Sequence, residues 1–134
     1  MNAETDLAKL IQDLEPRTLP ATYVFCSRED ADYGDLSHTS PLASFVEPEG
    51  LTLVITRESA DEEGLSYEGT FRCISLQVHS SLEAVGLTAA VTGELAARDI
   101  SANVIAGYHH DHIFVPSRQA ESALRLLETM SARR

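Results

Sequence analysis

Three stretches of the chain carry apolar residues at helical spacing. The first lies near the N-terminus, where positions i, i+3, i+4 and i+7 are apolar and Pro16 is the expected end. The second begins after Gly86 and runs to about Asp99, with apolar residues at every fourth position. The third follows Ser117, the expected N-cap of a C-terminal helix. The expected core stripes are Leu7, Leu10, Ile11 and Leu14, then Leu87, Val91 and Leu95, then Ala120, Ala123, Leu124, Leu127 and Met130.

Between these helices, β-branched, aromatic and alternating residues predict six strands. The strand at 72–78 alternates so that one face is strongly apolar, and Pro48-Glu49-Gly50 predicts a tight turn between two others. Residues 57–64 form a short helix candidate, and residues 27–41 form an acidic, solvated loop. The predicted strands are Tyr23–Cys26, Leu42–Glu47, Leu51–Thr56, Arg72–Val78, Ser101–Tyr108 and Ile113–Val115.

The order of these elements predicts an α+β protein with two similar halves, residues 1–66 and 67–134. The last five elements spell βαββα, which is a ferredoxin-like unit without its final strand. The first half is a degenerate βββα version, in which the acidic loop replaces the crossover helix. We therefore expect two tandem βαββ-type halves with antiparallel sheets and helices on one face, each half supplying an edge strand that the other lacks.

Composition and charge narrow the classes of partner. The chain has 134 residues and a net charge of −11, so phosphate backbones and anionic membrane surfaces are disfavoured. No apolar run approaches the roughly 20 residues that span a bilayer, and the acidic start Met1–Asp6 is not typical of a signal peptide. Cys26 and Cys73 do not make a disulfide framework. These features predict a reduced, cytoplasmic protein that binds neither nucleic acid nor membrane.

Most of the chain resembles a known family. From His79 to Met130, the order of strand, loop, glycine-led helix and strand resembles the ACT family of small-molecule-binding regulatory domains, as in amino-acid-regulated aspartokinases. Further runs resemble a narrower group of small, stand-alone bacterial proteins built of two ACT-like halves. The resemblance rests on residues 78–82, Gly86–Ala90, Leu95-Ala96, Ile100–Val104 and 106–116, and on Tyr23–Phe25 and Glu47–Val54.

The loop from His79 to Gly86 is the first candidate site. A helix start offers unpaired N–H groups and a partial positive charge, which suit a carboxylate, and glycine allows a ligand to approach closely. The resemblance implies that an amino acid binds here against the next strand. The alternative is a structural loop, in which Ser80 or Ser81 caps a turn with Glu83 and Asn103 satisfies local backbone. The candidate ligand-binding residues are His79, Ser80, Ser81, Leu82, Val85, Gly86, Leu87, Thr88, Asn103 and Val104.

Two acidic turn residues extend this candidate site. If the two halves face each other, Glu47 and Glu49 would meet the amino group of the same ligand. The favoured alternative is that they are ordinary exposed charges on a solvated turn, because charged turn residues are mostly exposed.

The histidine cluster His109–His112 is the second candidate site. Histidine is a common metal ligand, but a zinc site needs three or four ligands and the spacing here matches no recognised motif. A polar hairpin is the simpler interpretation, so we expect no metal and no cofactor. Both cysteines fall in predicted strands and are expected in the core.

The favoured function is therefore non-catalytic: a regulatory or sensor module that binds a small amino acid or related metabolite, as a homodimer formed through exposed sheet edges. One alternative is an interaction module without a ligand, whose partner is a metabolic enzyme. A less favoured alternative is a small metal-dependent enzyme that uses the histidine cluster.

Overall fold

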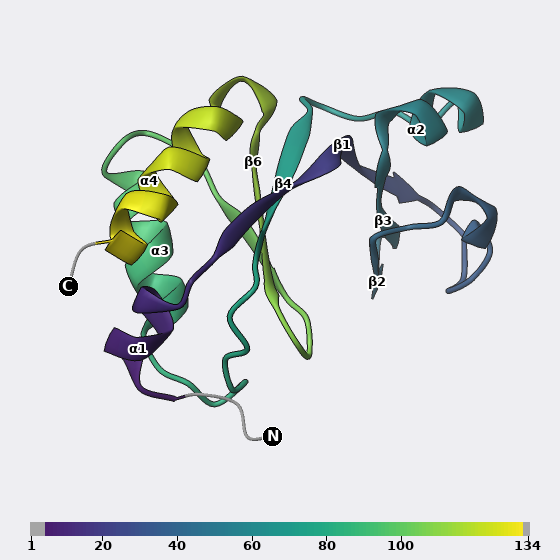
Figure 1. Cartoon of the computed structure of the whole chain (residues 1–134). Coiled ribbons are helices and arrows are strands. Elements are labelled where there is room, and N and C mark those ends of the chain that lie inside the picture. Colours follow the sequence, from purple (N-terminus) through teal and green to yellow (C-terminus); the bar gives the residue numbers. More distant parts are fainter. Residues whose placement is uncertain (1–4, 133–134) are drawn as a thin grey trace. The chain divides into compact units, whose positions relative to one another are not determined.

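A computed structural model describes residues 5–132, so the first four residues of the acidic N-terminal sequence lie outside the described part (Figure 1). The order of helices and strands predicted from the sequence is confirmed. The elements are α1 (Leu7–Gln12), β1 (Pro16–Arg28), a 3-10 turn (Ser37–Thr39), β2 (Ala43–Glu47), β3 (Gly50–Thr56), α2 (Arg57–Glu63), β4 (Phe71–Leu76), α3 (Leu87–Ala96), β5 (Asn103–Ala106), β6 (Asp111–Pro116), a 3-10 turn (Ser117–Gln119) and α4 (Ala120–Ala132).

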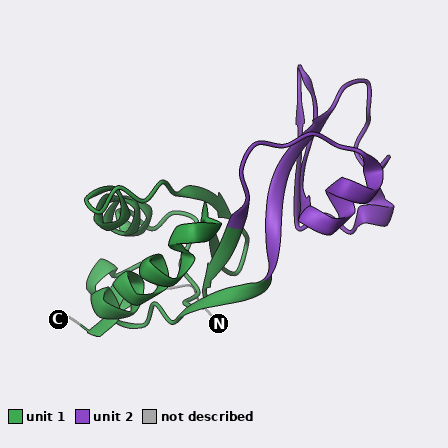
Figure 2. Cartoon of the chain, turned by 90° about the horizontal axis from the view of Figure 1, so that it is seen from above, with its two compact units in different colours: residues 1–20, 72–134 green, residues 21–71 purple. Residues whose placement is uncertain are grey.

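The chain forms two compact units, and strand β1 passes from one into the other (Figure 2). Within the described residues, unit 1 contains 5–20 and 72–132, and unit 2 contains 21–71. The boundary that the sequence predicts at 66/67 falls between α2 and β4, shortly before the chain leaves unit 2. The first helix and the start of β1 lie with the C-terminal elements in unit 1.

Strand β1 completes the sheet of unit 1. The strands pair in the order β2-β3-β1-β4-β6-β5, so the N-terminal part of β1 lies beside β4. The βαββα series from β4 to α4 thus gains the strand that it lacks, and β1 and β4 are both inner strands of the sheet. The pairing continues beyond the strands, because the N–H of Gln77 donates to the carbonyl of Glu15 at 3.1 Å.

Three helices close the core of unit 1. Helices α1, α3 and α4 contact one another and lie together in Figure 1. Helix α1 begins at Asp6, whose carboxylate accepts a hydrogen bond of 3.0 Å from the N–H of Ala8. The predicted stripes of α3 and α4 are largely confirmed, although Leu126 is buried and Leu124 is only half-buried; in the first stripe Leu7 is exposed and Leu14 is buried beyond the end of α1. Core residues from the three helices, two strands and the segment between α1 and β1 include Leu10, Leu14, Ile74, Val91, Leu95, Ile113, Val115 and Leu127.

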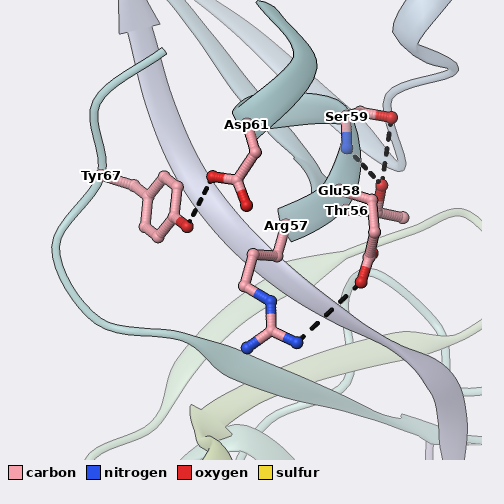
Figure 3. A network of polar contacts seen from close by, with 6 residues as sticks. All are labelled: Thr56, Arg57, Glu58, Ser59, Asp61 and Tyr67. Carbon is pink, nitrogen blue, oxygen red and sulfur yellow. Dashed lines mark hydrogen bonds and ion pairs between the residues drawn. The ribbon is translucent and has the colours of Figure 1, made fainter. Parts of the chain in front are cut away.

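In unit 2, the antiparallel strands β2, β3 and β1 bury one face beneath helix α2 and part of the acidic loop. The hydroxyl oxygen of Thr56 caps α2 by accepting from the N–H of Ser59 at 3.1 Å (Figure 3). Tyr67 then ties the following segment to the helix, because its hydroxyl donates to Asp61 at 2.8 Å. This hydrogen bond raises the pKa of Tyr67. The buried residues of this core are Val24, Cys26, Leu36, Leu51, Leu53, Ile55 and Ala60.

Three local predictions are wrong in detail. Strand β4 is buried on both faces between Cys73 and Leu76, rather than on one face, because it is an inner strand of the sheet. Pro16 begins β1 instead of ending a helix, since helix α1 already stops at Gln12. Ser117 lies inside a 3-10 turn whose preceding residue, Pro116, offers no side-chain cap. No helix of the described residues is long and apolar enough to cross a membrane.

Both cysteines are free and buried, as expected for core residues. Burial raises the pKa of the Cys26 thiol, and it raises the pKa of the Cys73 thiol from 9.0 to about 12. A thiol with such a pKa is protonated at neutral pH and is a poor nucleophile.

The raised pKa of Cys73 predicts a loss of stability in alkali. Above pH 9.0 the unfolded chain releases the thiol proton, whereas the folded chain keeps it until about pH 12. The contribution is therefore fully present below pH 9.0 and is lost as pH rises towards 12. From about pH 8 to about pH 10, we expect the free energy of unfolding in urea to fall by about 1.4 kcal/mol more in the native protein than in Cys73→Val. An equal fall in the free energy of unfolding of the two proteins would contradict this prediction.

Candidate functional site

The candidate site in unit 1 lies where the chain leaves β4 and enters α3. The N-cap of α3 is Gly86, at a φ of 100°, and no side chain caps the helix start. The first N–H groups of this ten-residue helix are therefore available to donate hydrogen bonds to a ligand. Leu87 anchors the first turn by burying its side chain, of which only 4% is exposed. The sequence places a glycine here because a side chain is strained at this φ.

A small turn precedes the helix. The carbonyl of Ser81 accepts from the N–H of Ala84 at 2.9 Å, and the Ser81 hydroxyl oxygen accepts from the N–H of Glu83 at 3.1 Å. This is the capped turn that the sequence offered as the structural role of the serine pair. The turn shapes the loop, and both serines line the space beside the helix start.

A cavity of about 140 Å³ adjoins this loop. Such a volume admits far more than one water but falls below the roughly 300 Å³ of drug-sized sites, so it suits a small ligand. Its lining includes the start of α3, three residues that carry hydroxyl groups, and Asp111 at the start of β6. The lining residues are Ser80, Ser81, Leu82, Ala84, Gly86, Leu87, Thr88, Ala106, Gly107 and Asp111.

The structure thus brings together six of the predicted site residues: Ser80, Ser81, Leu82, Gly86, Leu87 and Thr88. Asn103 and Val104 do not line the cavity, because they lie at the start of β5 and only its last residue, Ala106, reaches the wall. Asn103 precedes Ala106 by three residues, which is ~10 Å along a strand. Val104 packs instead against the core of unit 1.

His79 and Val85 flank the cavity without lining it. The ring of His79 lies 5.5 Å from that of His109 and 6.4 Å from that of Tyr108, measured between centroids. These contacts join the loop to the turn between β5 and β6. The side chain of Val85 is 84% exposed.

Asp111 lines the cavity but is absent from the ligand-binding residues predicted from the sequence. It was counted within the histidine cluster, where neighbouring imidazoles drew attention to metal binding. Its place beside Ala106 follows from the hairpin, because β6 begins at the end of the sheet where β5 finishes. Gly107 forms the tight part of this hairpin, and its N–H donates to the carbonyl of His110 at 2.9 Å.

Glu47 and Glu49 lie in unit 2, on the turn between β2 and β3, and both are exposed. The carboxylate of Glu47 accepts a short hydrogen bond from the hydroxyl of Thr52, across the same hairpin. Within unit 2 these residues have the geometry of ordinary turn carboxylates.

The histidine cluster spreads its side chains along a turn. His109 is exposed, while His110 and His112 are half-buried. Nδ1 of His110 is buried and has no hydrogen-bond partner in the described part of the chain. Among residues 5–132, no three histidine, cysteine or acidic side chains gather in a way that could hold a metal ion. The rings of His109 and His110 lie close to other aromatic rings.

Two family models match this chain, and together they cover nearly all of it. Both describe ACT domains, one over residues 2–72 and the other over residues 68–129. The chain therefore belongs to the ACT-domain family and consists of two ferredoxin-like ACT units. This confirms the fold and the resemblance found from the sequence. No curated protein matches the chain.

Solved structures agree with this assignment. A Vibrio cholerae protein of unknown function, described as a possible transport protein, is 47% identical, with a TM-score of 0.85 over 93% of this chain and 95% of that chain. A protein from Agrobacterium tumefaciens is 16% identical, with a TM-score of 0.71 over 87% of each chain. The regulatory subunit of aspartate kinase from Thermus flavus is 11% identical, with a TM-score of 0.63 over 86% of this chain and 95% of that chain. The last two show a shared fold.

Proposed function

We propose that this protein is a non-catalytic regulatory module that binds a small amino acid in the cavity beside α3. The observation that carries the proposal is that one small cavity is lined by both an uncapped helix start and Asp111. An amino acid carries one negative and one positive group, so each end would meet the opposite charge. The resemblance to aspartokinase regulatory domains supports the same class of ligand.

The residues of the cavity would then have distinct roles. The N–H groups of the first turn of α3 would bind the ligand carboxylate, and Asp111 would bind its ammonium group. The hydroxyls of Ser80 and Thr88 would complete the polar contacts. Leu82, Ala84 and Ala106 leave room for a small side chain, since they are the apolar part of the wall. The proposed ligand is therefore a small amino acid rather than an aromatic one.

Replacing Asp111 by asparagine tests this assignment. We expect the affinity for the amino acid found by a calorimetric screen of the twenty to fall by at least about tenfold, because a charge-assisted hydrogen bond contributes roughly 1.5–3 kcal/mol. The matched control is Asp99→Asn, which removes an exposed carboxylate of unit 1 at a φ of 57° that asparagine adopts readily. The proposal fails if no amino acid binds, or if both variants bind as well as the native protein.

We also propose that the protein acts as a cytoplasmic homodimer whose output reaches a metabolic enzyme. Support for association comes from β2, an edge strand whose Phe45 is 70% and Val46 63% exposed. Exposed apolar edges tend to pair with another strand. The free thiols support a reducing compartment. The predicted halves, 1–66 and 67–134, would be the repeated units. A monomeric mass in analytical ultracentrifugation would contradict the dimer.

A further inference from the structure

A second and larger cavity lies within unit 2, on the face of the sheet that carries the core. Its volume is about 340 Å³, which falls in the usual range for small-molecule sites. It lies over Leu53 and Ser44, which are cross-strand partners on β3 and β2, and the loop that joins β1 to β2 forms its wall. The lining residues are Tyr33, Gly34, Leu36, Ser37, Pro41, Leu42, Ala43, Ser44 and Leu53.

The cavity has a structural origin in the missing crossover helix. In unit 1 the connection between β4 and β5 contains α3, which contributes Leu87, Val91 and Leu95 to the core. In unit 2 the corresponding connection, between β1 and β2, contains a three-residue 3-10 turn and contributes Leu36 as its buried leucine. A loop therefore covers sheet surface that a helix covers in the other unit. The uncovered volume is the cavity.

The walls of the cavity combine an apolar floor with exposed edges. Leu53 and Leu36 are buried at 1% and 6% exposure and form the floor. Tyr33 and Leu42 remain 79% and 40% exposed, so both offer apolar surface to an incoming molecule. An aromatic ring on one side and leucines below favour a compact apolar body, either branched or a single ring.

The polar groups of the cavity favour a ligand with a hydrogen-bond donor over a ligand with a negative charge. The Ser44 hydroxyl donates to the carbonyl of Thr52 at 3.0 Å, which leaves its lone pairs free to accept. None of the lining residues carries a charge. The wall loop carries four carboxylates and its one histidine, His38, is paired with Glu63 at 2.9 Å. These carboxylates are Glu29, Asp30, Asp32 and Asp35; none lines the cavity, but Asp32 and Asp35 adjoin lining residues of the loop, and their charge favours a cation over an anion.

We propose that this cavity is a second ligand site that takes a small organic amine, with its apolar body over Leu53 and its ammonium group near Ser44 and the acidic loop. The site differs from the cavity beside α3 in unit, in lining and in ligand charge. It stands or falls independently of the proposed amino-acid site. A chain with both sites would respond to two kinds of small molecule.

Titration of the native protein with 2-phenylethylamine, followed by amide chemical shifts in NMR, tests the proposal. Saturable shifts are expected at residues 33–37 and at Ser44. Phenylacetate has the same ring but a negative charge, so we expect its affinity to be lower by about tenfold or more. Ser44→Phe should abolish the shifts by filling the cavity. Ser66→Phe is the matched control, since Ser66 is exposed in unit 2 outside the cavity.

Tyr33→Ala keeps the test valid if Ser44→Phe does not fold, because Tyr33 lies on an exposed loop. It should weaken amine binding, whereas Tyr108→Ala, a similarly exposed tyrosine of unit 1, should not. The proposal is overturned if the amine produces no saturable shift, if phenylacetate binds as tightly, or if the shifts fall on residues 80–88 instead. Loss of amino-acid binding at α3 would leave these outcomes unchanged.

Discussion

Replacing Leu14 by alanine is expected to lower the free energy of unfolding by about 3 kcal/mol. Leu14 is 0% exposed and belongs to the core of unit 1, where removal of a buried leucine side chain leaves a cavity. Its carbonyl also accepts from the N–H of Val78 at 3.4 Å, so the side chain lies at the point where the N-terminal segment joins the sheet. Urea unfolding followed by circular dichroism measures the change.

The control for this prediction is Leu82→Ala. Leu82 is 68% exposed, so the same chemical change should alter stability by less than about 0.5 kcal/mol. Native-state hydrogen exchange adds a local measurement: Leu14→Ala should speed exchange in β6, which shares its core, more than in β3 of unit 2. Equal acceleration in both strands would show that residues 5–20 do not stabilise unit 1 selectively.

The sequence predicts the elements well because their signals are local. The apolar spacing from Leu7 predicts a helix at the right place, although α1 ends before Leu14, and the turn around Gly50 identifies a hairpin. Strand β1 is longer than predicted, because only Tyr23–Cys26 has strand-like composition. The start of β1, residues 16–20, is a strand because it pairs with β4, a partner more than fifty residues away. Long-range pairing of this kind leaves no local pattern.

The candidate site shows the same division between local and distant information. The loop and helix start, from Ser80 to Thr88, follow from a glycine, two serines and the onset of helical spacing. The opposite wall depends on which end of β5 reaches the loop, and the sequence alone does not fix this. Asn103 was therefore chosen by resemblance, whereas the structure places Ala106 and Asp111 at the cavity.

Gly86→Ala is expected to destabilise the protein and to weaken amino-acid binding together. The residue has a φ of 100°, where an alanine is strained by about 1–3 kcal/mol. A Cβ atom there would also lie 3.2 Å from Cδ2 of Leu7, a half-exposed side chain that can move away. Backbone strain therefore dominates. Its relief would shift the first turn of α3, because the Gly86 carbonyl accepts from the N–H of Ala90 at 2.9 Å.

Gly93→Ala is the matched control on the same helix. Gly93 lies within α3, has open space around its Cα and has no positive φ, so alanine should stabilise the protein by roughly 0.5–1 kcal/mol. The same substitution thus has opposite signs seven residues apart. Calorimetry with the bound amino acid should show affinity reduced by about tenfold or more for Gly86→Ala and unchanged for Gly93→Ala. If Gly86→Ala loses stability but keeps its affinity, the first turn of α3 does not bind the ligand carboxylate, and the amino-acid site must lie elsewhere.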